Sequence, residues 1–174
     1  MQVWRFAAGW QGRTILAGAG AMLLALLLQA ALSVAWAQEG VLLTVTDAAG
    51  NTRSFDRAAL ETLPQQSFTT TTIWTDGVLS FSGPPLRVVL AAAGIKGGRV
   101  ELAALNDYVV ELDLAETTET VPIIATRQNG QAFDVRENGP LWVLYPYDST
   151  PDFQTEPVYA SSVWQIVAVR ALVP

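Results

Sequence analysis

Side chains that could bind a small molecule gather in the second half of this sequence, in three clusters. The first cluster is Asn106, Asp107 and Tyr108, which stand between two predicted strands, where side chains can point away from a sheet. A tight turn explains the same residues equally well, because Asn and Asp favour turns on conformational grounds alone. The second is Arg127, which ends a predicted strand and for which a surface salt bridge is an equally good interpretation.

The third cluster is a predicted strand and its exit loop, which carry Trp142, Tyr145, Tyr147 and Asp148. Side chains alternate along a strand, so Trp142 and Tyr145 are predicted to face opposite sides of the sheet. We therefore predict that Tyr145, Tyr147 and Asp148 line a pocket and that Trp142 lies in the core. Trp164 begins the final strand and is assigned to the core in preference to a ligand contact.

Two residue types that commonly perform chemistry are missing, because the sequence contains no cysteine and no histidine. The first absence excludes disulfides and thiolate-bound metals. The second removes the usual general base and the Ser-His-Asp arrangement of hydrolases. No calcium-loop pattern is present, although a metal site made only of carboxylates stays open. These absences favour binding over catalysis, and no residue is assigned a catalytic or metal-binding role.

The first 37 residues have the organisation of an export signal. Arg5 and Arg13 precede an uncharged apolar run over residues 14–34, and Ala35-Trp36-Ala37 forms an A-x-A cleavage site. We expect cleavage and a periplasmic location. The alternative is a retained membrane anchor, because the run is nearly long enough to span a bilayer. No twin-arginine pair precedes the run, so we expect export of an unfolded chain without a bound cofactor.

Cleavage would leave residues 38–174, a single domain of ordinary size that can bury a core. All sixteen acidic residues and eight of the ten basic residues lie in this part, so its net charge is −8. An acidic surface argues against nucleic acid and anionic lipid as partners.

Many short strands and few short helices are predicted, which indicates an α+β domain. The predicted strands are 40–46, 51–55, 67–74, 78–81, 99–104, 108–112, 121–127, 141–145 and 163–170, and the helical segments are 57–62, 86–93 and 113–119. Two of these strands, 141–145 and 163–170, are almost continuously apolar, which predicts the centre of a sheet. The polar segment 149–160 is predicted to be a plain surface loop, in preference to a lid or a partner-contact loop.

Six motifs occur in a characteristic order: Phe81-x-Gly83-x-x-Leu86, Leu105-Asn-Asp-Tyr108, Ala125-Thr-Arg127, Asn129-Gly130, Gly139-Pro-Leu-Trp142 and Trp164. Together they resemble the oxidoreductase molybdopterin-binding domain family, which has the sulfite-oxidase-type fold. The resemblance covers residues 66–172 and implies a mixed, barrel-like β-sheet with short helices. In the family's enzymes a cysteine just before the first motif holds molybdenum. Here Trp74 or a neighbour stands at that position.

Within this family, the short exported members without cysteine look most similar. Some of them bind a reduced pterin and act on the periplasmic domain of a membrane diguanylate cyclase/phosphodiesterase, which changes cyclic-di-GMP output. The resemblance therefore implies a non-catalytic periplasmic pterin-binding protein whose partner is such an enzyme or a sensor kinase. Pterin recognition needs a face for stacking and a polar group for the N–H edge. The implied pterin site comprises Trp74, Asn106, Asp107, Tyr108, Arg127, Trp142, Tyr145, Tyr147, Asp148 and Trp164, with Asp107 on the edge and Arg127 on the ring or carbonyl.

Two other functions stay open. One is a molybdopterin-dependent oxidoreductase, or a subunit of one. The other is an interaction module that uses the same fold without a ligand, because a fold does not determine a function.

Overall fold

The computed structural model describes residues 40–173 of the 174-residue chain. The predicted export signal and its cleavage site lie outside these residues. Within residues 40–173, no helix combines the length and the apolar character that a membrane crossing requires.

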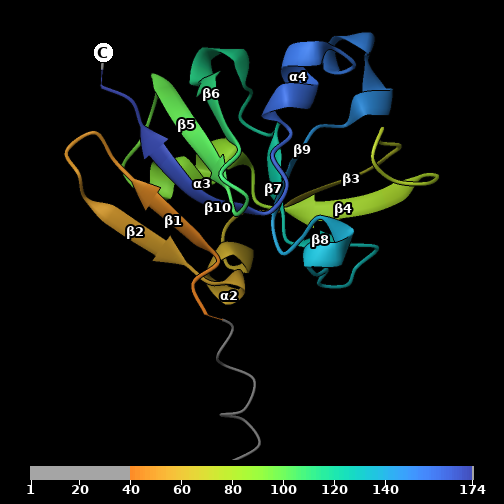
Figure 1. Ribbon diagram of the computed structural model, residues 1–174, viewed down its shortest axis with the longest axis horizontal. Helices are drawn as coiled ribbons and strands as arrows, with labels where there is room; N and C mark the ends of the chain where they lie inside the picture. The colour runs from red at the N-terminus through yellow and green to blue at the C-terminus, as the bar shows by residue number, and fades with distance from the viewer. Residues whose placement is uncertain (1–39, 174) are drawn as a thin grey trace, which may run out of the picture. The chain divides into compact units, whose positions relative to one another are not determined.

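Mixed sheets and a few short helices make up the described domain, which is the α+β class expected from the sequence (Figure 1). The strands are β1 (Leu43–Thr46), β2 (Thr52–Phe55), β3 (Gln66–Thr70), β4 (Leu79–Gly83), β5 (Arg99–Ala104), β6 (Val109–Asp113), β7 (Ile123–Ala125), β8 (Arg127–Gln128), β9 (Trp142–Leu144) and β10 (Ile166–Ala171). The helices are α2 (Arg57–Glu61), α3 (Leu86–Ala92) and α4 (Glu156–Ser161). Short 3-10 helices are η1 (Leu114–Glu116), η2 (Val135–Glu137), η3 (Tyr147–Ser149) and η4 (Pro151–Phe153).

The largest sheet has the strand order β2-β1-β10-β5-β6. Strands β1 and β10 pair in parallel and the other pairs are antiparallel. Strand β10 is central, as its apolar sequence predicted. Helix α3 lies behind β5 and β10 in Figure 1. It buries Leu86, Val89 and Leu90, whose spacing places them on one face of a helix.

Two smaller sheets complete the domain, with the orders β3-β4-β8 and β7-β9. None of the three sheets in the described residues closes into a barrel, so the barrel-like part of the expectation is not met. Strand β9 was predicted at the centre of a sheet. The structure contradicts this prediction, because β9 pairs with β7 in a two-stranded sheet and its other edge makes only an isolated bridge between Trp142 and Trp164. Its apolar character has another cause: all three of its residues are buried in the core.

The predicted strand 121–127 is divided at Thr126 into β7 and β8. The Thr126 N–H donates to the carbonyl of Ser82, 2.9 Å away, and its carbonyl accepts from the buried guanidinium of Arg57. After this residue the chain changes its partner from β9 to β4. A long-range polar contact therefore ends a strand that the local sequence would continue.

Two further differences from the sequence predictions concern segments that carry aromatic residues. The predicted strand 67–74 ends at Thr70, so Trp74 lies in a loop over residues 71–78. The predicted loop 149–160 contains η4 and α4, and Tyr159 lies within α4. Both segments contribute to the pocket described next.

Candidate ligand-binding pocket

A cavity of about 210 Å³ opens where four segments meet. These segments are the loop 71–78, the end of β5 with its following turn, helix α4, and the residues that lead into β10. We call this cavity the aromatic pocket. Its lining residues are Trp74, Ala104, Asn106, Tyr108, Tyr159, Ala160, Ser162, Val163 and Trp164.

Trp74 is the ring around which the other aromatic residues are arranged. Its ring centroid lies 5.7 Å from that of Trp164 and 5.8 Å from that of Tyr159, at interplanar angles of 67° and 86°. Edge-to-face geometry of this kind is the arrangement that aromatic quadrupoles favour. The pocket walls are therefore rings that meet at steep angles and do not stack.

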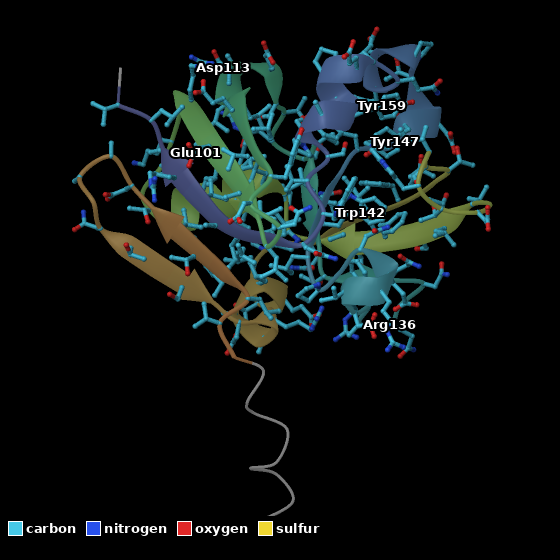
Figure 2. All side chains as sticks on the ribbon, viewed as in Figure 1. Glu101, Asp113, Arg136, Trp142, Tyr147 and Tyr159 are labelled. Atoms are coloured by element: carbon cyan, nitrogen blue, oxygen red, sulfur yellow. The ribbon has the colours of Figure 1, made fainter. Side chains whose placement is uncertain are left out.

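Two further rings support Trp74 from the core. Trp142 is fully buried and meets Trp74 edge-to-face at 5.7 Å, and its Nε1–H donates to the carbonyl of Ser162 at 3.1 Å. Tyr147 meets Trp74 at 6.1 Å. Figure 2 shows Trp142, Tyr147 and Tyr159 in succession from the centre of the domain toward α4. The core position predicted for Trp142 is confirmed, and this residue forms part of the support beneath the pocket.

Tyr145 and Tyr147 do not line the pocket, contrary to the prediction from the sequence. Both are buried, and their hydroxyls form hydrogen bonds with Ser161 Oγ at 3.0 Å and Ser162 Oγ at 2.6 Å. Burial raises the pKa of each phenol above its ordinary value. The physical reason is that β9 is buried on both faces. Alternation along this strand therefore does not direct the side chains that follow it, those of Tyr145 and Tyr147, toward a surface.

Asp148 was also predicted at the pocket, and it too lies outside the lining. Its carboxylate accepts from the hydroxyl and from the backbone N–H of Thr71, each at 2.6 Å. The hydrogen bond from the Thr71 hydroxyl has the largest effect, followed by the one from the Thr71 N–H, and together they hold the pKa of Asp148 below its ordinary value. Asp148 therefore anchors the start of the loop that presents Trp74.

The predicted cluster at residues 106–108 is divided by the structure. Asn106 and Tyr108 line the pocket, whereas Asp107 is not among the lining residues. Asp107 has a positive φ of 65°, and the Asn106 side chain accepts from the Tyr108 N–H at 3.2 Å. This is the tight turn that Asn and Asp favour. The Tyr108 hydroxyl donates to the carbonyl of Ala160 at 2.9 Å, which ties this turn to α4.

Arg127 is placed away from the pocket as well. Its guanidinium forms a two-pronged ion pair with Glu61, with Nε–Oε1 and Nη2–Oε2 distances of 2.8 and 2.9 Å. Planar pairing of this kind is geometrically specific. The salt-bridge interpretation therefore accounts for Arg127, and its predicted contact with a ligand ring is not supported.

Of the ten residues predicted from the sequence, the structure brings four together at the pocket: Trp74, Asn106, Tyr108 and Trp164. Sequence reasoning missed Tyr159, because it assigned a loop to the segment that forms α4. A helix signal was present, since Thr155 stands at the N-cap position and a proline follows within the first turn.

The lining contains no charged side chain of either sign. In residues 40–173, no three acidic, histidine or cysteine side chains come together in a way that could hold a metal ion. Molybdopterin carries a phosphate and, in the enzymes of the resembled family, a metal held by a thiolate. The pocket offers neither a basic side chain nor a sulfur ligand, and its volume is below the roughly 300–1,000 Å³ of typical cofactor sites. These residues do not fit molybdopterin.

Comparison with known proteins supplies a likeness of fold. No protein-family model and no curated protein sequence matches the chain. Among solved structures, the chain is similar to the sulfane dehydrogenase SoxCD from Paracoccus pantotrophus, with a TM-score of 0.54 and 17% sequence identity. The match covers 74% of this chain and 37% of that one, so this protein spans much less than half of its structural neighbour. This likeness shows that the chain shares the fold of part of that protein.

Proposed function

We propose that this protein is a non-catalytic receptor for a small planar ring, of the reduced pterin type, and that the ligand occupies the aromatic pocket. The observation that carries the proposal is the lining itself. Four aromatic rings, an amide and a serine surround a cavity that is large enough for one compact ring system. Ligand pockets in general combine apolar walls with a few polar groups that orient the ligand.

The polar groups at the pocket suit the edge of such a ring. In residues 40–173, the Asn106 amide nitrogen, the Trp164 indole nitrogen and the Tyr159 hydroxyl have no hydrogen-bond partner within the protein. They are therefore available to a ligand or to water. Asp107, in the turn between two lining residues, is the carboxylate that was predicted from the sequence for the pterin N–H edge, although it is not itself part of the lining.

A signalling role is the second part of the proposal. It follows from the family resemblance in the sequence, in which a periplasmic pterin-binding protein acts on a membrane diguanylate cyclase/phosphodiesterase or a sensor kinase. Tyr108 of the lining is exposed, and so are its neighbours in sequence Leu105 and Val109; these side chains would give a partner an apolar surface. Ligand-dependent capture of the partner's periplasmic domain tests this part.

Ligand binding is tested by anaerobic calorimetric titration with a tetrahydropterin, with an oxidised pterin as the comparison ligand. Saturable one-to-one binding is expected for the reduced form. The Trp164→Leu variant removes one wall and should lose binding. The Arg127→Ala variant is the matched control and should keep it, because Arg127 lies in an ion pair outside the lining. Equal affinity of the wild type and Trp164→Leu for tetrahydropterin would refute this site.

An oxidoreductase, or a subunit of one, is the second candidate, and the dehydrogenase with the similar fold favours it. The absence of cysteine from the entire sequence opposes it. Elemental analysis of the protein purified from its native compartment separates the two functions. Stoichiometric molybdenum would support the enzyme, and its absence together with tetrahydropterin binding would support the receptor.

A further inference from the structure

The walls of the aromatic pocket suit a second chemical class of ligand. We infer that the pocket binds small quaternary ammonium cations, with Trp74, Tyr108, Tyr159 and Trp164 as the walls of an aromatic cage. This inference shares the pocket with the proposed pterin but does not depend on pterin binding.

The number and the geometry of the rings favour a cage for a cation. Four of the nine lining residues are tryptophan or tyrosine, the two ring types that attract cations most strongly. Tyr159 and Trp164 each meet Trp74 at a steep angle with centroids less than 6 Å apart. Tyr108 adds a ring from the turn after β5, on a different segment. Rings that meet at corners in this way surround a compact ligand on several sides.

The distribution of charge around the pocket also favours a cation. No lysine or arginine lines the pocket, so nothing in the lining repels a cation. Arg127 is paired with Glu61, and Figure 2 shows Arg136 at the opposite end of the domain from Tyr159. The chain carries a net charge of −6, and Asp107 stands next to two lining residues in sequence. An excess of negative charge raises the local concentration of cations and lowers that of anions.

Hydrogen bonding distinguishes a quaternary from a primary ammonium group. An ammonium ion that carries N–H groups loses hydration on entry and needs acceptors in exchange. Three acceptors of the lining already receive a hydrogen bond, which leaves the Tyr159 hydroxyl as the one side-chain oxygen of the lining without a partner in residues 40–173. The Asn106 carbonyl oxygen accepts from the Tyr108 N–H, the Ala160 carbonyl accepts from the Tyr108 hydroxyl, and Ser162 Oγ accepts from Tyr147. A tetra-alkylated nitrogen has no N–H groups to satisfy, so the apolar and aromatic walls suffice.

The test is to titrate choline into the protein expressed from the full-length gene and to monitor binding by tryptophan fluorescence and by calorimetry. All three tryptophans of residues 40–173 belong to the pocket or to its support, so their fluorescence reports on this site. The matched ligand is 3,3-dimethyl-1-butanol, the uncharged carbon isostere of choline. Choline should bind at least about tenfold more tightly than the isostere, since one desolvated cation–π contact corresponds to about that factor.

A pair of variants separates the ring face from the hydroxyl at one wall. Tyr159→Phe keeps the ring and should retain choline binding, whereas Tyr159→Leu removes it and should weaken choline binding with little effect on the isostere. Equal affinity for choline and its isostere, or unaltered choline affinity in Tyr159→Leu, would overturn the inference. Choline binding without tetrahydropterin binding would support the cage and refute the proposed function. The reverse result would refute the cage and leave the proposed function intact.

Discussion

The two tryptophans that line the aromatic pocket should contribute very differently to stability. Among residues 40–173, Trp74 makes edge-to-face contacts with four rings, at centroid distances of 5.7, 6.1, 5.8 and 5.7 Å, whereas Trp164 makes one, with Trp74 itself. Both side chains are partly buried. We therefore compare Trp74→Leu with Trp164→Leu, which make the same chemical change at the same cavity.

The expected difference follows from the three additional ring contacts. Each aromatic pair contributes about 0.5–1.5 kcal/mol beyond the burial of its area. Contacts that share one ring are not additive, so we take the lower part of the summed range, about 2 kcal/mol. For a domain of this size that difference corresponds to a melting temperature about 6 °C lower for Trp74→Leu than for Trp164→Leu.

Urea and thermal unfolding followed by far-ultraviolet circular dichroism measure this difference directly. Ligand titration of the same variants provides the second readout, and both should bind tetrahydropterin more weakly because each loses a wall. Equal unfolding free energies for the two variants would show that the ring contacts of Trp74 do not stabilise the fold. The account of Trp74 as the centre of the pocket would then be wrong.

Three further outcomes are expected. Burial raises the pKa of the Tyr147 phenol in the folded state. The stability that the neutral phenol contributes is therefore complete below about pH 10, the unfolded pKa, and is lost as the pH rises further. Above about pH 10, the melting temperature of Tyr147→Phe should fall less steeply with pH than that of the wild type. Gly83→Ala should lower the free energy of unfolding in urea by about 3 kcal/mol, because a Cβ there would lie 1.9 Å from a backbone carbonyl oxygen of β7. Gly97 has open space around it, so the unfolding free energy of Gly97→Ala should stay within about 0.5 kcal/mol of the wild-type value. Asp148→Asn should lower the protection factor of the Thr71 amide against hydrogen exchange and weaken ligand binding. The wild type should show both effects as the pH falls through the lowered pKa of Asp148, once the exchange rate is corrected for its intrinsic dependence on pH.

Features determined by neighbouring residues were predictable from the sequence. The helical segment predicted over residues 57–62 forms α2, and Asp56 caps it with a carboxylate that accepts from the Ala59 N–H at 2.7 Å. The turn between β5 and β6 was marked by Asn106 and Asp107, which adopt it with the expected left-handed residue. Such elements depend on local conformational preference, which a single sequence carries.

Features determined by distant partners were not predictable. Arg127 stands 66 positions from Glu61, and the hydroxyl of Tyr147 bonds Ser162, 15 positions away at the end of α4. Neither pairing leaves a local signal, so Arg127 and Tyr147 looked as available to a ligand as Asn106 and Tyr108 did. The sequence therefore predicted that aromatic residues line the pocket. Which of them do so depends on the tertiary structure.

The paired hydroxyls beneath α4 have a consequence for the kinetics of ligand entry. Tyr145 with Ser161, and Tyr147 with Ser162, attach the end of α4 to the core through two buried hydrogen bonds. Lifting α4 would break both, at a cost of roughly 0.5–1.5 kcal/mol each before any exposure of apolar surface. A ligand therefore enters a pocket that already has its bound shape. Association should follow a single exponential whose rate rises linearly with ligand concentration, without the plateau that a preceding conformational step imposes.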